Sequence, residues 1–228
     1  MSMDDLVARI LSQRQLVPKT RGLLVAVSGI DGSGKGYVTR QIVARLAQQS
    51  VATASINVDG WLNLPQKRFC PKSPAENFYK QAIRSEDLFA KLLLPLRDER
   101  SIHLIADFAE ETAHAYRSHT YSFKNIDVVL VEGIFLFKRE YRELFDLRIW
   151  IDCSFSTALA RALRRNQEGL SPAATIRAYK TIYFPAQRIH FEKDQPRESA
   201  DLIVDNDPYP YSASTLPKEI VTHQAPAL

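Results

Sequence analysis

Hydrophobic residues occur in short, unbroken runs separated by stretches of helical periodicity. The continuous apolar run over residues 23–28 and the mainly apolar stretches 128–137 and 147–153 are typical of strands that are buried on both faces of a parallel sheet. Residues 53–58 and 200–206 predict two further strands. The chain therefore contains the strands of a parallel sheet. The most central of them is interrupted at Gly133, and the short strand over 53–58 ends next to Asp59.

Residues 101–108 alternate more regularly between apolar and polar positions than the other predicted strands. Strict alternation indicates a strand that is buried on one face only. We therefore expect this strand to lie nearer an edge of the parallel sheet. In that position its carboxyl end would bring Asp107 close to the ends of the other strands.

Between the strands, apolar positions recur every three to four residues, which predicts helices. The predicted helices cover residues 37–49, 85–96, 156–169 and 171–184. Ser171 and Pro172 are suitable as the N-cap and first residue of the last helix. This alternation of strands and helices predicts an α/β fold of three layers, with a parallel central sheet and right-handed crossovers.

The chain length and the ends of the chain suggest one domain with two extensions. The 228 residues, 45% of them hydrophobic, suit one domain with a small lid. We assign residues 1–21 to an N-terminal helical extension, 22–207 to the domain and 208–228 to a polar, proline-rich tail.

Charge and cysteine content narrow the range of partners. A net charge of +4 suits an anionic small molecule such as ATP but is too weak to indicate nucleic acid. Cys70 and Cys153 lack metal-type spacing, which fits free thiols in a reducing compartment. No apolar run reaches the length of a membrane span. We expect a cytoplasmic protein without a nucleic-acid or membrane partner. The sequence is compatible with a homo-oligomer.

The stretch GIDGSGKG has the spacing of a phosphate-binding loop, G-x-x-x-x-G-K. Four of the eight glycines of the chain fall within it. Successive backbone N–H groups and the start of the next helix can surround phosphates, and Lys35 adds a positive charge for the β- and γ-phosphates. The expected ATP-binding residues are Gly29, Ile30, Asp31, Gly32, Ser33, Gly34, Lys35, Gly36 and Tyr37.

Gly36 departs from the motif, which has Ser or Thr at this position. That hydroxyl normally binds Mg²⁺, and glycine offers no substitute. Thr39, a turn further along, is too remote for direct ligation. Two interpretations stay open: a water molecule takes the place of the hydroxyl, or the site binds nucleotide without turning it over.

Carboxylates end the predicted strands beside this loop. Glu132 and Asp59 are candidate magnesium ligands, and Asp59 is also the candidate general base for a substrate hydroxyl that attacks the γ-phosphate. Asp107 is a candidate for binding the substrate. A carboxylate at one strand end is usually solvated or caps a helix, but three such ends beside a phosphate loop favour a functional role.

The motifs together resemble the uridine kinase and phosphoribulokinase family of P-loop kinases over residues 22–207. The phosphate loop is followed by VDGW (58–61), ADF (106–108), VVLVEGIFLF (128–137) and LRIWIDC (147–153), and residues 179–206 resemble the closing segment of that family. The resemblance implies a P-loop kinase core with a lid that phosphorylates a hydroxyl group with ATP and Mg²⁺.

Several residues differ from the family pattern, and two of them lie in the segment that helps to recognise the nucleoside in uridine kinases. Ala106 stands in the position of a tyrosine in the uridine kinases, and Glu111 aligns with a histidine of the same segment. Gly36 replaces the hydroxyl residue. The phosphotransfer residues therefore match the family better than the residues for uridine specificity do.

Arg161, Arg164 and Arg165 share one face of a predicted helix, where they form either a solvated surface or part of a lid over ATP. A lid of about 161–170 would bring cations to the transferring phosphoryl group, and we select Arg164 and Arg165 for this catalytic role, together with Lys35 and Asp59. The aromatic residues of 76–84 and 113–123 either stack on a nucleobase or pack in the core. The substrate-binding candidates are Asp59, Phe78, Tyr79, Arg84, Asp107, Tyr116 and Arg117.

The sequence therefore predicts an ATP-dependent kinase that acts on a uridine- or cytidine-like nucleoside or a related hydroxylated metabolite. The alternative is a nucleotide-binding regulatory module with little turnover, which Gly36 suggests. A nucleic-acid kinase or binder ranks last, because the chain lacks a dense basic stripe and any RNA-binding module.

Overall fold

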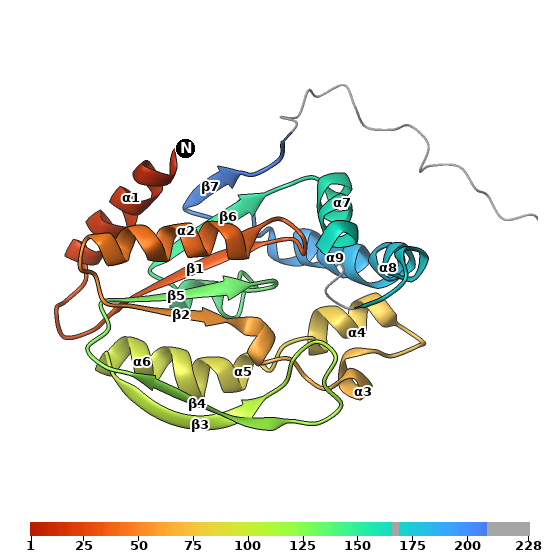
Figure 1. The fold of residues 1–228 in the computed structure, drawn as a ribbon, viewed down its shortest axis with the longest axis horizontal. Coiled ribbons are helices and arrows are strands. Elements are labelled where there is room, and N and C mark those ends of the chain that lie inside the picture. Colours follow the sequence, from red (N-terminus) through yellow and green to blue (C-terminus); the bar gives the residue numbers. More distant parts are fainter. Residues whose placement is uncertain (166–168, 209–228) are drawn as a thin grey trace, which may run out of the picture.

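The computed structural model of the protein describes residues 1–165 and 169–208. Its centre is a five-stranded parallel sheet with the strand order β2-β5-β1-β6-β7 (Figure 1). The strands are β1 Leu23–Gly29, β2 Thr53–Asn57, β5 Val128–Gly133, β6 Leu147–Asp152 and β7 Leu202–Asp205. The predicted α/β fold with a parallel central sheet is confirmed.

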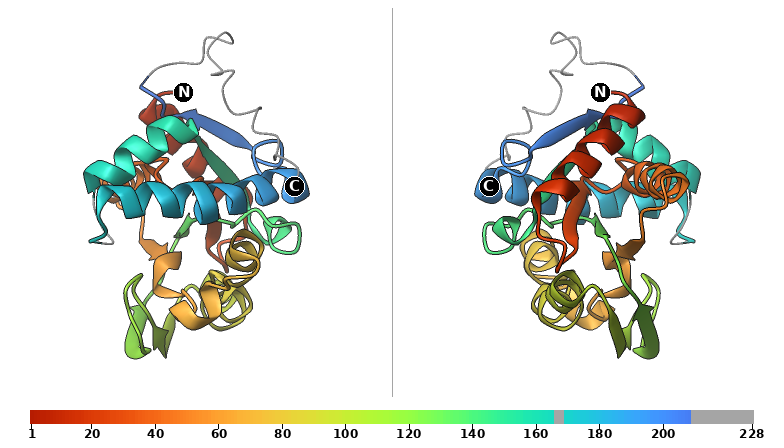
Figure 2. Two further views of the ribbon diagram at one scale, coloured as in Figure 1. Left: turned by 90° about the vertical axis from the view of Figure 1, so that its right-hand side faces the viewer. Right: turned by 90° about the vertical axis from the view of Figure 1, so that its left-hand side faces the viewer.

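Both faces of the sheet are buried because helices cover each of them (Figures 1 and 2). On one face, Leu23, Val25 and Val27 of β1 pack with residues of α1 (Met3–Leu16) and α2 (Lys35–Gln48). On the opposite face, Leu24 and Ala26 belong to the core that contains α4 (Pro74–Gln81), α6 (Leu94–Glu99) and α9 (Phe184–Asp194). This burial explains why the strands read as unbroken apolar runs.

The N-terminal helix α1 is joined to the same core as the sheet. Ser2 and Asp5 form a reciprocal capping box at its start. Leu6, Val7 and Ile10 are buried against α2 and β1. The first residues of the chain therefore contribute apolar contacts to the domain as well as extending it.

The predicted strand over 101–108 does not belong to the parallel sheet. It forms β3 (Ile102–Phe108), which pairs antiparallel with β4 (Arg117–Phe123) in a separate two-stranded sheet. One face of β3 is exposed, which is the cause of its alternating pattern. Asp107 lies opposite Ser118 in this hairpin and is exposed, so placing it at the carboxyl edge of the parallel sheet was wrong.

The remaining helical segments connect the strands. They are α3 (Pro65–Arg68), α5 (Ser85–Leu88), α7 (Phe155–Arg165) and α8 (Pro172–Ala178), with π-helical segments at Phe89–Leu93 and Tyr179–Tyr183 and short 3₁₀ turns at Val58–Gly60 and Arg142–Leu144. The predicted N-cap is confirmed, since the Ser171 side chain accepts a hydrogen bond from the backbone N–H of Ala174.

Parts of two predicted segments fall outside the described residues, namely 166–168 of the lid and 209–228 of the tail. Within the described residues, no helix is long and apolar enough to cross a membrane. Cys70 and Cys153 are free thiols.

The end of β5 depends on a glycine for close packing. A Cβ atom at Gly133 would lie 2.1 Å from Cγ2 of Val58, which is itself buried. We expect Gly133→Ala to lower the free energy of unfolding by about 1–3 kcal/mol, since an inserted methyl group in a packed core forces its neighbours apart. Denaturant unfolding measures this loss. Gly22→Ala is the control for a Gly-to-Ala change without a severe clash, because its backbone φ is not positive and its added Cβ would lie 3.4 Å or more from the surrounding carbonyl oxygens.

Candidate active site

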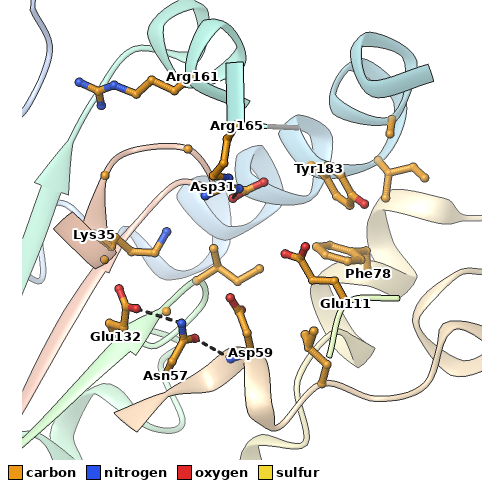
Figure 3. Close-up of a pocket in the computed structure, with 18 of the residues that line it drawn as sticks. Asp31, Lys35, Asn57, Asp59, Phe78, Glu111, Glu132, Arg161, Arg165 and Tyr183 are labelled. Atoms are coloured by element: carbon orange, nitrogen blue, oxygen red, sulfur yellow. Dashed lines mark hydrogen bonds and ion pairs between the residues drawn. The ribbon is translucent and has the colours of Figure 1, made fainter. Parts of the chain in front are cut away.

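A cleft of about 770 Å³ opens at the carboxyl edge of the parallel sheet. The loop after β1, the ends of β2 and β5, and the helices α4 and α7 contribute to its wall (Figure 3). The described residues of its charged half are Asp31, Lys35, Arg40, Asn57, Asp59, Glu132, Arg161 and Arg165. The carboxyl edge, where ligands bind in open parallel sheets, therefore carries the ionisable groups expected of a phosphate-transfer site.

The phosphate-binding loop joins β1 to α2. Gly32 and Gly34 have φ values of +78° and +94°, a region that favours glycine. Gly34 is also the N-cap of α2, so the positive end of this helix begins within the loop. Of the nine expected ATP-binding residues, the structure places Asp31, Gly32, Gly34, Lys35, Gly36 and Tyr37 on the cleft wall. Gly29, Ile30 and Ser33 are buried beneath it.

The Lys35 ammonium group folds back onto the phosphate-binding loop. Its Nζ donates a hydrogen bond of 2.9 Å to the backbone carbonyl of Ile30. Burial lowers the pKa of Lys35, and the nearby carboxylates of Asp31, Glu132 and Asp59 oppose that shift. A partly desolvated ammonium group among acidic side chains is suited to exchange its carbonyl partner for phosphate oxygens.

Asn57 connects the two carboxylates at the floor of the cleft. Its Nδ2 donates to Oε1 of Glu132 at 2.9 Å, and its Oδ1 accepts from the backbone N–H of Asp59 at 2.8 Å (Figure 3). The adjacent parallel strands β2 and β5 bring Asn57 and Glu132 into register. Asn57 thereby positions the Glu132 side chain and the turn that carries Asp59.

Desolvation shifts the pKa values of Asp59 and Glu132 in the same direction. Burial raises the pKa of Asp59, and it also raises the pKa of Glu132, while the positive charge of Lys35 lowers both. A raised pKa means that each carboxylate lacks full compensation for its charge. The pair is therefore prepared to accept a proton or a cation.

Helix α7 supplies two of the three predicted lid arginines to the cleft, Arg161 and Arg165. Arg161 anchors the phosphate loop, because its Nη1 donates to the carbonyl of Ser33 at 2.9 Å and its Nη2 to the carbonyl of Asn206 at 2.6 Å. Arg164 is exposed and does not line the cleft, although its spacing places it on the same broad helical face, so its position does not support the catalytic role selected for it.

Asp31 links the phosphate loop to the helices beyond α7. Its carboxylate accepts a hydrogen bond from the hydroxyl of Tyr179 and lies 3.6 Å from Nη2 of Arg165. The loop, α7 and the π-helical segment therefore meet at one side chain. Arg165 is held at the mouth of the phosphate loop by this contact (Figure 3).

The other half of the cleft is largely apolar. Phe78, Tyr183 and Glu111 lie together across the cleft from Lys35 (Figure 3). Phe78 stacks on Phe69, with ring centroids 5.8 Å apart and an interplanar angle of 15°. The remaining residues of this half are Leu62, Arg68, Phe69, Thr112, Leu170, Ala178 and Ile182. The apolar lining of this half suits the less polar part of a small-molecule ligand.

Of the predicted substrate-binding residues, Asp59 and Phe78 line this cleft and the other five lie outside it. Tyr79 is turned into the core, where its hydroxyl donates to Asp194 at 2.7 Å. Arg84 lies over the rings of Trp61 and Tyr116, which face the β3–β4 side. Asp107 and Arg117 are exposed on the β3–β4 hairpin.

Sequence reasoning missed several residues of the site. Asn57 and Asn206 lack a motif of their own, although each stands at the end of a strand, where a polar residue is worth notice. Asn206 holds the loop by donating from Nδ2 to the carbonyl of Ser33 at 2.7 Å. Glu111 had a signal in its alignment with a histidine of the family, and the structure places it on the cleft wall.

Two comparisons with known proteins, one with a family model and one with single sequences, point to the same family. Residues 24–205 match the Phosphoribulokinase / Uridine kinase family. The uridine kinase of Staphylococcus aureus (strain JH9) is 27% identical over 191 residues, which cover 79% of this chain and 86% of that protein.

Two solved structures share the fold. The structure of a possible uridine kinase from Bacillus stearothermophilus has a TM-score of 0.71 at 21% identity and covers 89% of this chain and 97% of its own. D-glycerate 3-kinase from Cryptococcus neoformans has a TM-score of 0.62 at 14% identity, covering 89% and 95%. The matched family spans the phosphate loop, both cleft carboxylates and the closing segment, so the chain belongs to the phosphoribulokinase / uridine kinase family and is a P-loop small-molecule kinase.

Proposed function

We propose that the protein transfers the γ-phosphate of ATP to a hydroxyl group of a nucleoside or of a related hydroxylated metabolite in the cytoplasm. The observation that carries this proposal is the convergence of Lys35, Asp59 and Glu132 on one cleft beside the phosphate loop. Phosphoryl transfer demands positioning and charge stabilisation more than covalent chemistry, and these residues supply both.

Each side chain has a defined part in the transfer. The backbone of the loop and Lys35 bind the β- and γ-phosphates. Asp59 accepts the proton of the acceptor hydroxyl as its oxygen attacks the γ-phosphorus and the bond to the β-phosphate oxygen breaks. Arg165, released from Asp31, approaches the transferring group from α7. ADP and the phosphorylated acceptor are the products.

The residues fit a magnesium ion. Two carboxylates whose pKa values are raised by burial gain compensation from a cation. Among the described residues, no group of three or more His, Cys, Asp or Glu side chains could hold a metal. Glu132 and Asp59 would therefore share the ion with phosphate oxygens and water, as Mg²⁺ commonly requires. When bound, Mg²⁺ neutralises charge on the phosphates.

The acceptor is proposed to occupy the apolar half of the cleft. Phe78 contributes to the apolar wall of the cleft although it is 6% exposed, and Glu111 places a carboxylate on the same wall. Because Glu111 replaces a histidine of the family, the polar edge of the acceptor is read by a different group here than in the uridine kinases. This difference favours testing nucleosides together with sugars and other polyols.

An acceptor screen tests the proposal. ADP formation is measured with Mg²⁺-ATP and, in turn, nucleosides, sugars, polyols and hydroxy acids. We expect at least one acceptor to stimulate ADP formation above the rate of ATP alone. Tight ATP binding without stimulation by any acceptor would instead favour the nucleotide-binding module without turnover that Gly36 suggests.

Glu132→Gln tests the assignment of the metal. The amide keeps the size of the side chain and can still accept from Asn57, but it loses the negative charge that attracts the cation. We expect the Mg²⁺ concentration for half-maximal turnover to rise about tenfold, with ATP affinity in metal-free buffer unchanged or higher. A magnesium titration of ADP formation measures the shift. Glu110→Gln, on the β3–β4 side, is the matched control. An unchanged magnesium requirement in Glu132→Gln would make Glu132 a structural residue.

A further inference from the structure

Two charged side chains border the space beside Gly36. A Cβ atom built at Gly36 would lie 3.3 Å from both carboxylate oxygens of Glu132 and 3.5 Å from Nη1 of Arg40. In most phosphate loops of this type, this space receives the hydroxyl side chain of Ser or Thr. Here a guanidinium group stands at its border.

Arg40 follows Gly36 by four residues on α2, so both lie on the same helical face above the cleft. The described residues give Arg40 no hydrogen bond or ion pair, although its positive charge acts on Glu132. Arg45, one turn further along the same helix, is instead fixed to Asp4 at 2.9 Å. Arg40 is thus a cation at the cleft with its hydrogen-bond donors available.

From this geometry we propose that Arg40 binds the phosphates of ATP and supplies the positive charge that the missing hydroxyl residue would otherwise bring through magnesium. The inference deepens the proposed function and rests on it. A guanidinium group presents a planar fork of N–H donors that matches two phosphate oxygens at once. Such a contact compensates phosphate charge without any protein ligand at position 36.

In this interpretation, the missing hydroxyl at position 36 is accompanied by a guanidinium group at position 40. Because a Cβ atom at 36 would be in ordinary contact with Nη1 of Arg40 at 3.5 Å, a hydroxyl residue at 36 and the guanidinium would adjoin in the same part of the cleft. The chain therefore holds one of two alternative solutions. In one, a hydroxyl completes the magnesium site; in the other, a guanidinium reaches the phosphates.

The role of Arg40, and its relation to the residue at position 36, can be tested by ATP binding alone. Calorimetry measures the Kd of ATP in EDTA and in excess Mg²⁺ for the native protein, Arg40→Met, Gly36→Ser and the double variant. Methionine keeps the length of the aliphatic stem and removes the charge. Arg45→Met is the matched control, since it removes a charge from the same helix outside the cleft. Thermal unfolding of each variant verifies that it is folded.

We expect Arg40→Met to weaken ATP binding in EDTA by about tenfold or more, the loss of a charged hydrogen bond to phosphate. The loss in Mg²⁺ is smaller, because the metal then carries the compensation. Gly36→Ser in the Arg40→Met background should increase the gain in affinity that Mg²⁺ brings, because the space is free for the hydroxyl. Arg45→Met should bind ATP as the native protein does.

Equal ATP affinities of native and Arg40→Met in EDTA, with measurable binding by both, would overturn the role of Arg40 and leave the kinase proposal intact. Failure of the native protein to bind ATP in either buffer would instead overturn the kinase proposal, and the inference with it. The two failures are thereby distinguished by the native protein alone.

Discussion

Lys35→Ala is expected to reduce ATP binding below detection by calorimetry. Lys35 is the only lysine on the cleft wall among the described residues, and it lies within the loop that surrounds the phosphates. Its replacement removes an ammonium group from a site that keeps the carboxylates of Asp31, Asp59 and Glu132. The triphosphate would then lose the positive charge nearest the loop while these three carboxylates remain beside it. We expect a loss of at least about a hundredfold in affinity, equal to about 2.7 kcal/mol.

The control for this experiment is Lys91→Ala, which removes an exposed lysine that pairs with Asp87 far from the cleft. Its ATP affinity should equal that of the native protein. Lys35→Ala should also unfold at a similar temperature, since its Nζ makes a single hydrogen bond to Ile30. An ATP affinity of Lys35→Ala within threefold of native would contradict the assignment of residues 29–37 as the phosphate site.

Asp59→Asn is expected to keep ATP binding and to slow phosphoryl transfer by about 10² to 10⁴, the usual contribution of a positioned general base. The amide preserves the shape of the side chain but cannot accept the proton of the acceptor hydroxyl. Single-turnover measurements of product formation isolate this step from binding. Asp107→Asn, on the β3–β4 hairpin outside the cleft, is the matched control and should transfer at the native rate.

The same variant has a predicted effect on stability. Burial raises the pKa of Asp59 above its value in the unfolded chain, so the folded protein holds its proton more tightly. The contribution of Asp59 to stability is therefore fully present below the unfolded pKa and is lost as the pH rises through the folded pKa. At pH 7, Asp59→Asn removes an ionised carboxylate that burial disfavours.

We therefore expect Asp59→Asn to unfold at a temperature equal to or above that of the native protein at pH 7, with the difference vanishing towards pH 4. Thermal unfolding measured across this pH range gives the comparison. Slow transfer together with undiminished stability would separate a chemical role from damage to the fold. A variant that is both inactive and destabilised at pH 7 would contradict the interpretation of Asp59 as a strained functional carboxylate.

Local signals in the sequence predicted the parallel sheet and the floor of the cleft well. Strands such as β1 and β5 are buried on both faces, and this environment leaves an unbroken apolar run that is readable from sequence alone. The phosphate loop is equally local, because its geometry depends on the glycines at 32 and 34 and not on distant contacts. Glu132 follows directly from its place at the end of such a strand.

Features that depend on contacts with other segments of the chain could not be predicted from the local sequence. The β3–β4 hairpin was not recognised because β4 is a polar and aromatic segment that gains its strand structure from pairing with β3. Tyr79 was misread as a cleft residue, since its burial depends on Asp194, which lies 115 positions away. The outward turn of Arg164 depends on how α7 packs, and a helical face of three arginines does not reveal which two face inwards.

Transfer of labelled phosphate is the measurement that tests the central claim most directly. The protein is incubated with [γ-³²P]ATP and each acceptor in turn, and the products are separated and identified by mass spectrometry. We predict a labelled acceptor monophosphate, formed in equal amount to ADP, with native enzyme and with Asp107→Asn, and at a rate reduced by about 10² or more with Asp59→Asn. Release of label only as inorganic phosphate, or equal transfer by native protein and Asp59→Asn, would contradict a kinase whose chemistry resides in this cleft.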